Sequence, residues 1–137
     1  MLGRANHLLR RRLRDRLSRH RVTITQYTAL SILSASRQLS NAQLAERALV
    51  SPQAANETIR TMELRGWIER EPEPSHGRII QLRVTPRGEK LLAACHQSVA
   101  ELEEQMLGDM DEAARTVLLG QLQNLVRRLG TMELVPD

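Results

Sequence analysis

Aromatic side chains are nearly absent from this 137-residue sequence, which has no phenylalanine, one tryptophan and one tyrosine. Proteins that bind single-stranded nucleic acids stack the bases on aromatic rings, so Trp67 and Tyr27 alone argue against that class. Because hydrophobic residues still make up 41% of the chain, the core must be built from aliphatic side chains. The length predicts one domain with a modest core.

The sequence also lacks the features of secreted, membrane-spanning and catalytic proteins. Cys95 is the only cysteine, so no internal disulfide can form. No apolar run approaches the length of a membrane-spanning helix. No glycine-rich phosphate loop, metal-ligand cluster or nucleophile motif is present. We therefore expect a soluble, cytoplasmic protein that has no membrane contact, is not an enzyme and uses neither a metal nor another cofactor.

Arginine, in contrast, is abundant. The chain contains nineteen arginines and a single lysine, Lys90, and its formal net charge is +4. A GC-rich genome accounts for much of the excess of arginine over lysine, but not for where the arginines lie. Guanidinium groups suit phosphate oxygens and base edges through paired hydrogen bonds, so this charge balance favours a polyanionic partner.

Helix-start signals recur in the first third of the chain. Leucines spaced four residues apart predict a first helix over residues 5–20, with one apolar stripe and a basic remainder. Thr23 and Gln26 have the spacing of a capping box, in which two polar side chains bond the free amides that begin a helix. Ser40 and Gln43 repeat this pattern and predict a second, short capped helix.

The clearest helix start is Ser51-Pro52. Serine accepts hydrogen bonds from the unpaired amides of the first turn, and proline at the first helical position loses no bond because its missing N–H had no partner there. From Ser51 the helix is predicted to run to Arg65, where Gly66 ends it. Two capped helices joined by a tight turn predict a helix-turn-helix motif.

A β-hairpin is predicted directly after this motif. Residues 67–70 and 78–85 are strand-like, and the two prolines and the glycine of residues 71–77 predict a loop between them. The fold class is therefore predicted to be mainly α with a small β-hairpin wing, a winged helix-turn-helix. Such a protein lays one helix in the major groove of duplex DNA and its wing on a neighbouring minor groove.

The second helix of the motif has one face suited to reading bases. Its apolar residues Ala55, Ile59 and Met62 share one side and are predicted to pack inward. On the other side, glutamine and asparagine can pair with adenine, arginine with guanine or phosphate, and a carboxylate with cytosine. A solvated polar face is the plain alternative, but this face precedes a basic hairpin. We assign DNA contact to Ser51, Gln53, Ala54, Asn56, Glu57 and Arg60.

The hairpin supplies further candidate contacts. Arg78 lies at the exit of the predicted loop, where a long side chain can enter a narrowed minor groove. Arg70 is a candidate phosphate contact and His76 a candidate contact at the tip. For Arg83 a phosphate contact and an exposed strand charge are equally consistent with the sequence. Glu57 is the difficult residue, because a carboxylate near phosphates is repelled unless it meets a cytosine amine or an arginine.

In this order and at these spacings, the motifs resemble those of the MarR family of transcriptional regulators, over essentially the whole chain. Single motifs are weak signals, but their ordered combination is specific. They are Thr23-Ile-Thr-Gln26-Tyr27, Leu44-Ala45, Ser51-Pro52, Leu64-Arg65-Gly66-Trp67-Ile68-Glu69-Arg70, Arg78 and Thr85-Pro86-Arg87-Gly88.

The resemblance implies a winged-helix homodimer that binds a palindromic double-stranded DNA operator near its own promoter. Such proteins usually repress, and many release DNA when a small molecule or an oxidant binds. One motif departs from the family: the wing usually carries Asp-x-Arg, whereas here it reads His76-Gly77-Arg78. Glu69 or Glu73 would have to replace the missing aspartate, or the wing binds the minor groove less tightly.

Dimerisation is expected from the apolar stripes as well. The first helix and the helices after the hairpin expose more apolar surface than the lobe at residues 22–88 can cover. We expect residues 1–21 and 89–137 to join two copies, with all 137 residues forming one domain. The acidic C-terminal helices can pair with the basic first helix. The dimer contacts are predicted to be Leu9, Leu13, Leu17, Leu122, Leu125 and Leu129.

Cys95 lies on an apolar stripe and is interpreted as a buried, inert thiol, with the adjacent His96 pointing elsewhere on the helix. We expect a small organic effector in the cleft between the dimerisation helices and the DNA-binding lobe, or no ligand. Two alternatives stay open beside the regulator. One is an enzyme, against which the missing motifs argue. The other is a winged-helix protein–protein interaction module with weak or lost DNA specificity.

Overall fold

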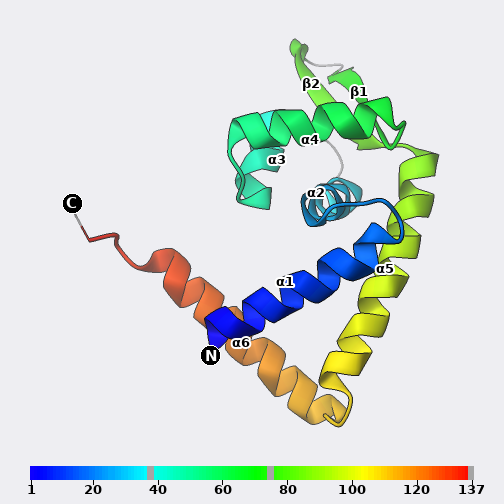
Figure 1. The fold of residues 1–137 in the computed structure, drawn as a ribbon. Coiled ribbons are helices and arrows are strands. Elements are labelled where there is room, and N and C mark those ends of the chain that lie inside the picture. The colour runs from blue at the N-terminus through cyan, green and yellow to red at the C-terminus, as the bar shows by residue number, and fades with distance from the viewer. Residues whose placement is uncertain (37–38, 74–75, 136–137) are drawn as a thin grey trace. The chain divides into compact units, whose positions relative to one another are not determined.

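The described part of the chain folds into six helices and one β-hairpin. The computed structural model describes residues 1–36, 39–73 and 76–135, with the backbone alone at residues 72, 73 and 76–80. No helix in these ranges is both long and apolar enough to cross a membrane. The elements are α1 (Leu2–Ser18), α2 (Ile24–Ala35), α3 (Asn41–Ala48), α4 (Pro52–Leu64), β1 (Ile68–Glu73), β2 (His76–Val84), α5 (Pro86–Leu107) and α6 (Glu112–Thr131) (Figure 1). The predicted fold class is confirmed.

Both predicted capping boxes are present. The Thr23 hydroxyl accepts from the Gln26 amide at 3.1 Å, and the Gln26 side chain accepts from the Thr23 amide at 3.0 Å. Ser40 and Gln43 form the same pair of bonds at 3.2 and 2.9 Å. Each box satisfies amides that the helix itself cannot bond, so the starts of α2 and α3 are set locally.

The limits of α4 also follow the sequence prediction. The Ser51 hydroxyl accepts from the Ala54 amide at 3.1 Å, and Pro52 occupies the first turn. At the other end Arg65 is the C-cap and Gly66 has φ +74°. A left-handed residue is needed to reverse the chain there, and glycine adopts that conformation without a steric penalty.

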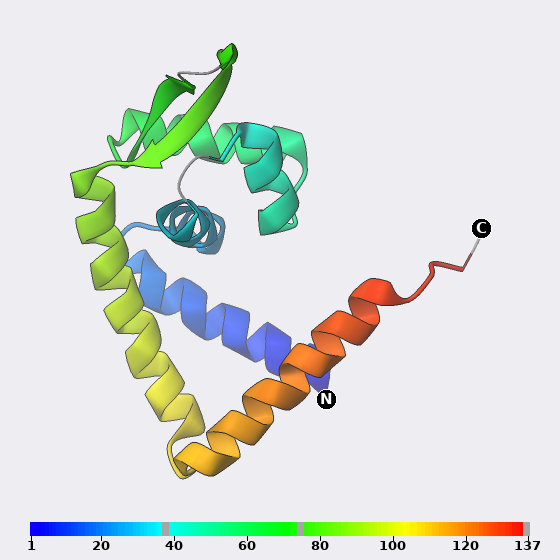
Figure 2. The same ribbon diagram turned by 180° about the vertical axis from the view of Figure 1, so that it is seen from behind.

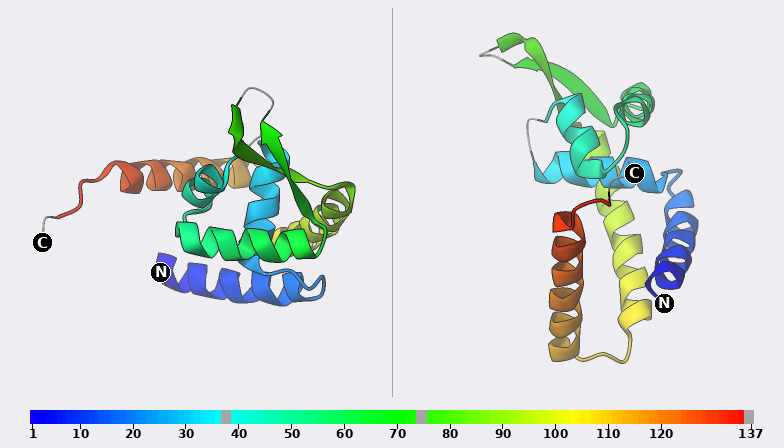
Figure 3. Two further views of the ribbon diagram at one scale, coloured as in Figure 1. Left: turned by 90° about the horizontal axis from the view of Figure 1, so that it is seen from above. Right: turned by 90° about the vertical axis from the view of Figure 1, so that its left-hand side faces the viewer.

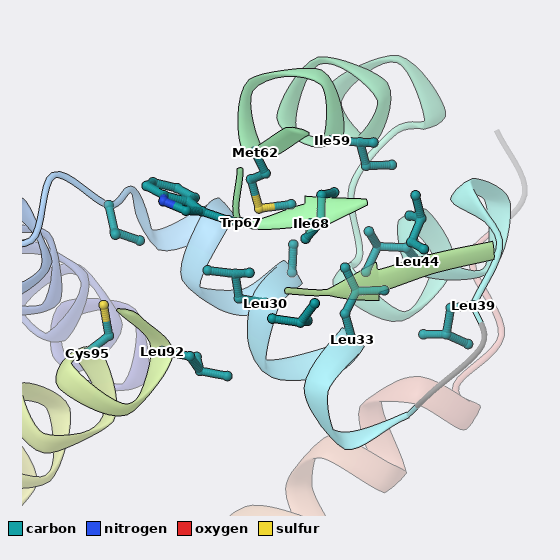
Figure 4. Packing of buried hydrophobic residues seen from close by; sticks show 14 of the residues in the cluster. Leu30, Leu33, Leu39, Leu44, Ile59, Met62, Trp67, Ile68, Leu92 and Cys95 are labelled. Carbon is teal, nitrogen blue, oxygen red and sulfur yellow. The ribbon is translucent and has the colours of Figure 1, made fainter. Parts of the chain in front are cut away.

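The core is a mainly aliphatic cluster between the helices and the hairpin. In two opposite views α2 lies between α1 and α4, and the hairpin lies against α4 (Figures 1 and 2). Burying one leucine, isoleucine or methionine side chain stabilises the fold by roughly 1.5–3 kcal/mol. The cluster includes Leu30, Leu33, Leu39, Leu44, Ile59, Met62, Trp67, Ile68, Leu82 and Leu92 (Figure 4).

The hairpin is antiparallel and is attached to the helices at its base. Ile68 pairs with Val84, and Leu82 forms an isolated bridge with Leu39 through an N–H···O bond of 3.0 Å. Its buried side chains at this end join the core, while the strands extend beyond the helices of the lobe (Figure 3). The hairpin therefore has a fixed base and a projecting end.

The predicted loop at residues 71–77 was too long. β1 continues to Glu73 and β2 begins at His76, so most of that segment is strand. The register shifts between Pro72 and Glu73. Both strands of a two-stranded sheet are edges, where a proline is tolerated because one side of the strand needs no amide donor. The proline therefore marks an irregularity rather than the end of the strand.

The Thr85-Pro86-Arg87-Gly88 motif joins the hairpin to α5. The Thr85 hydroxyl donates to the Gly66 carbonyl at 2.6 Å and accepts from the Gly88 amide at 3.1 Å. The Thr85 amide donates to the Trp67 carbonyl at 3.0 Å. Gly88 packs so closely on the base of the hairpin that a Cβ there would lie 2.1 Å from the Trp67 oxygen and 2.8 Å from Val84 Cγ1. Position 88 therefore requires glycine because there is no space for a side chain, and not because of its backbone dihedral angles.

Contacts divide the chain into two units, Met1–Leu102 and Glu103–Asp137. In the second unit the turn before α6 is held by Arg115, which bonds both Glu104 oxygens at 2.6 and 3.2 Å and the Met110 carbonyl at 3.0 Å. This pairing lowers the pKa of the Glu104 carboxyl. Asp111 caps α6 through the Ala114 amide at 2.8 Å. α6 itself contributes no buried residue.

Candidate nucleic-acid interface

Helix α4 has one face in the core and the opposite face exposed. Ala55, Ile59 and Met62 are buried, as predicted. Because helical residues three and four apart share a face, burying these three orients the remaining side chains outward. The Ser51 hydroxyl accepts the capping bond of this helix, so the contact that the structure shows for it is structural. The half-buried Ala54 adds little bulk there. The exposed residues are Gln53, Asn56, Glu57 and Arg60.

This face combines the donors and acceptors that discriminate base pairs. An amide side chain presents a donor and an acceptor together and matches adenine, while a guanidinium fork matches guanine. The side chains of Gln53, Glu57 and Arg60 have no hydrogen-bond or ion-pair partner within the ranges that the structure describes. Within the described part of the chain, the donors and acceptors of these side chains therefore remain available to bind DNA. Base contact by these residues stays a prediction.

Asn56 is positioned by a residue that the sequence interpretation did not single out. The Asn41 side chain, in the first turn of α3, donates from Nδ2 to Asn56 Oδ1 at 3.1 Å. This bond leaves the Asn56 Nδ2 donors and one Oδ1 lone pair available, which is the pattern that pairs with adenine. An asparagine after a capping serine carries no sequence signal for this role, because its partner lies fifteen residues away.

We expect Asn41→Ala to weaken operator binding by about three- to tenfold, the equivalent of one lost hydrogen bond. The physical reason is that Asn56 loses the contact that holds its amide in place. Affinity for a duplex bearing the operator checks this, with Glu46→Ala, at an exposed position of the same helix, as the control. Unchanged affinity in the Asn41 variant would show that Asn56 needs no positioning.

On the hairpin, the two candidate phosphate contacts Arg70 and Arg83 are already ion-paired. Arg70 Nε donates to Glu63 Oε1 at 2.6 Å and so joins β1 to the end of α4. Arg83 lies between Glu69 and Glu71, with 3.1 Å from its Nη2 to Glu71 Oε1. The hydrogen bond to Glu69, followed by the charge of Glu71, raises the pKa of the Arg83 guanidinium. For Arg83 the structure supports the exposed, paired strand charge.

The predicted wing contacts His76 and Arg78 lie in β2 by their backbone, but their side chains are outside the described residues. Their roles therefore stay predictions. Glu69, one of the two carboxylates considered as a partner for Arg78, is bonded to Arg83. The side chain of Glu73, the other one, is also outside the described residues.

Cys95 is fully buried on the inner side of α5, next to Leu92 (Figure 4). Burial raises the pKa of its thiol, so the reactive thiolate is disfavoured. His96 points elsewhere, with its Nδ1 2.7 Å from the Tyr27 hydroxyl. Within the described ranges, no group of three or more acidic, histidine or cysteine side chains could hold a metal ion.

We expect Cys95→Ser to leave DNA binding after hydrogen peroxide treatment unchanged, because a buried protonated thiol does not react readily. The same change should lower the free energy of unfolding by about 1–3 kcal/mol, since it buries a hydroxyl in an apolar site. DNA titrations before and after peroxide, run on both proteins, check this. A peroxide response that only the wild-type protein shows would contradict the inert-thiol interpretation.

The predicted dimer contacts differ in exposure. Leu17 is 0% exposed and belongs to the core of a single chain. The prediction that it contacts a second copy was therefore wrong. α1 contacts α2, a packing that the sequence pattern alone could not reveal. Leu9 and Leu13 are partly buried. Leu122, Leu125 and Leu129 are 42, 42 and 64% exposed on one stripe of α6.

The expected pairing of the basic first helix with acidic C-terminal residues is present within one chain. Arg16 Nη1 lies 3.6 Å from Glu101 Oε2 of α5. This contact gives one N-terminal arginine a structural role. It joins α1 to α5 inside the first unit, where the buried Leu17 also anchors α1.

Comparison with known proteins agrees with this geometry. Residues 22–80 match the model of the MarR family. The chain is 33% identical over 131 residues to the HTH-type transcriptional repressor Rv2887 of Mycobacterium tuberculosis, covering 96% of this chain and 91% of that protein. The crystal structure of the Mycobacterium tuberculosis MarR family protein Rv2887 in complex with salicylic acid is similar, with 30% identity, a TM-score of 0.75 and coverage of 90% and 92%.

A second similar structure contains DNA. The transcriptional repressor CouR bound to a 23-mer DNA duplex is 22% identical, with a TM-score of 0.83 over 91% of this chain and 89% of that one. At this identity the likeness shows that the fold is shared. The wild-type MarR of E. coli in its apo form is 23% identical, with a TM-score of 0.77 over 91% and 96%.

Proposed function

This chain belongs to the MarR family of winged-helix transcriptional regulators, and from that premise we propose that it represses transcription as a homodimer bound to a palindromic operator. In this proposal α4 of each copy reads one half-site in the major groove. The wing, through Arg78, follows the adjacent minor groove. A small organic ligand lowers the affinity for DNA and releases the operator.

The observation that carries the proposal is the exposed face of α4. It presents Gln53, Asn56, Glu57 and Arg60 beside a projecting hairpin, on a helix whose other face is locked into the core. A rigid helix with base-reading side chains on one side is what recognition in the major groove requires. Glu57 fits a half-site that contains a cytosine, because its carboxylate needs an amine donor there.

Two copies are proposed because no residue of α6 is fully buried within one chain. A helix with an exposed leucine stripe gains stability by packing that stripe against another helix. Symmetry then places two α4 helices on half-sites about one duplex turn, roughly 10 base pairs, apart. The two-fold symmetry of such a dimer is the reason why a palindromic operator is proposed.

A carboxylate-bearing ligand is proposed from the salicylic acid bound to the 30% identical relative. In this chain a pocket of about 420 Å³ lies between α1 and the start of α2. Its walls combine guanidinium groups with the apolar Val22 and Ile24, which suits a small aromatic acid. Adding salicylate to the protein–operator complex tests this: the expected result is release of DNA. Arg10→Gln with Arg14→Gln, at two of the lining residues, should remove the response.

The experiment that tests DNA recognition is a fluorescence-anisotropy titration. It compares a duplex from upstream of the gene with a coding duplex of equal length, at low and near-physiological salt. A specific regulator should prefer the upstream duplex by about a thousandfold or more. Equal, weak binding that salt abolishes would leave only nonspecific phosphate attraction. The winged helix would then serve as a surface for binding another protein. Two features favour this alternative: the acidic Glu57 on α4, and His76 at the wing position where the family usually has aspartate.

Base and backbone contacts should respond differently to substitution. Arg78→Ala is expected to weaken binding to the operator and to unrelated DNA together, because a minor-groove arginine senses shape and charge. Asn56→Ala and Gln53→Ala are expected to lower discrimination between operators by about 1–3 kcal/mol per lost bidentate contact. Titrations against duplexes with single substitutions separate the two effects. Unchanged discrimination in both α4 variants would remove these residues as readers.

A further inference from the structure

A second surface of the first unit concentrates positive charge at the C-terminal end of α4, beyond the residues proposed to read bases. A pocket of about 640 Å³ lies where the end of α1, the end of α4 and the start of α5 meet. We call it the basic pocket. It is lined by His20, Arg21, Leu64, Arg65, Trp67, Arg87, Lys90 and Leu91.

The charge in this pocket is not balanced by the described residues around it. Its lining contains three arginines and the only lysine of the chain, and none of these lining residues is acidic. The neighbouring carboxylates are turned to other partners: Glu63 pairs with Arg70, and Glu89 accepts from Ser34 at 3.0 Å. Like charges that converge without a counter-charge repel each other, so a bound anion would relieve the repulsion.

One of the cations is held in place by contacts, and a second passes close to the backbone. The Arg65 guanidinium carbon lies 5.0 Å from the centre of the Trp67 ring, and Arg65 Nη1 donates to the Arg21 carbonyl at 2.7 Å. The Arg87 side chain lies over Gly66, where a Cβ would be 3.9 Å from its Cδ. Guanidinium groups fixed by such contacts lose less freedom when they bind an anion than free side chains do.

Arg21 has an unfavourable backbone conformation at the edge of this pocket. Its φ is +59°. It follows α1 as the left-handed residue of a Schellman motif, in which the Arg21 amide donates to the Ser18 carbonyl at 3.0 Å and the Val22 amide donates to the Leu17 carbonyl at 3.2 Å. Glycine is the residue preferred at that position, because a Cβ is strained there. An arginine at a strained position beside other cations points to a use for its side chain.

We propose that the basic pocket binds a multivalent oxyanion of the phosphate type. Guanidinium forks match the geometry of phosphate oxygens, and the lysine adds a flexible point charge. The phosphate can belong to a free phosphorylated small molecule or to the backbone of DNA that flanks the bases read by α4. Leu64 of the pocket lies one turn after Arg60 on α4, so a duplex phosphate is within the reach of this region.

The chain offers two site-specific reporters of this binding. Trp67 is the only tryptophan, and Lys90 is the only lysine. Inorganic pyrophosphate, added to the full chain without DNA at constant ionic strength, should change Trp67 fluorescence with saturation. It should also protect Lys90 from acetylation, measured by peptide mass spectrometry. Because this arm contains no DNA, its outcome does not depend on operator recognition.

Two variants test the site, and a third is the control. Arg87→Gln with Lys90→Gln should weaken pyrophosphate binding by about tenfold or more, since charge-assisted bonds are lost. Arg127→Gln with Arg128→Gln removes the same charge from exposed positions of α6 and should bind as the wild-type protein does. Arg21→Gly should also weaken binding while its melting temperature stays at or above that of the wild-type protein, because glycine relieves the strain. Weaker binding with a retained fold cannot be attributed to unfolding.

The outcomes distinguish the two sources of phosphate. Saturable pyrophosphate binding that the pocket variants lose supports the site with a free anion as its ligand. A Trp67 response to duplex DNA of any sequence, lost in the pocket variants and absent with pyrophosphate, supports the site with backbone phosphate as its ligand. No saturable response to either, or an equal response in the wild-type protein and the pocket variants, overturns the proposal.

Discussion

Replacing Gly88 by alanine is expected to lower the free energy of unfolding by about 3 kcal/mol, the upper part of the range for overpacking. The added Cβ would lie 2.1 Å from the Trp67 carbonyl oxygen, and that oxygen is fixed by its bond from the Thr85 amide. Neither backbone can move without breaking the junction between the hairpin and α5. Urea unfolding followed by circular dichroism measures the change.

Gly120→Ala is the matched control. Apart from its chain neighbours and the backbone of its own helix, no atom of the described residues lies within 4 Å of a Cβ at this position of α6. Alanine should therefore raise helix stability by up to about 1 kcal/mol through its higher propensity. Equal unfolding midpoints for the two variants would show that the close packing of Gly88 on Trp67 and Val84 does not contribute to stability.

Leu122→Glu combined with Leu125→Glu is expected to convert the proposed dimer into a monomer and to weaken operator binding by about a hundredfold or more. Both leucines are exposed on the α6 stripe, and charges buried there would be desolvated without a partner. A monomer also loses the gain from binding two half-sites at once, which is typically a hundredfold or greater. Analytical ultracentrifugation and anisotropy titration measure the two effects.

Thr116→Glu with Gln123→Glu adds the same two charges on the opposite side of α6, where both residues are exposed. This control should remain a dimer and keep its affinity for the operator, apart from a small general repulsion. If the leucine variant still sediments as a dimer, the α6 stripe does not form the interface. If both variants dissociate, added charge on α6 rather than loss of the leucine stripe is responsible.

The helix limits and the orientation of the recognition face could be predicted from the sequence because they depend on nearby residues. Capping by Thr23, Ser40 and Ser51 involves amides three positions away, and Gly66 acts within its own turn. The spacing of Ala55, Ile59 and Met62 identified the buried side of α4, and therefore the exposed side as well. The same local reasoning failed at Pro72, where proline predicted a loop that pairing with β2 replaced by strand.

The partners of polar groups could not be predicted in the same way. Asn41 and Asn56, Arg70 and Glu63, and Arg83 and Glu69 are each brought together by the fold. In the sequence each of these residues is one of several polar residues with many candidate partners. The basic pocket is a stronger case, because its lining comes from segments at residues 20–21, 64–67 and 87–91.

The sequence by itself determined the order of the helices and hairpin, the caps and the face of α4 that remains exposed, because each depends on contacts within a few residues. Only the tertiary structure decided what covers each apolar stripe. Leu17 and Leu122 follow the same helical periodicity, yet Leu17 is fully buried within one chain and Leu122 is exposed. Periodicity reports that a side chain lies on an apolar face, whereas its burial depends on which distant element packs there.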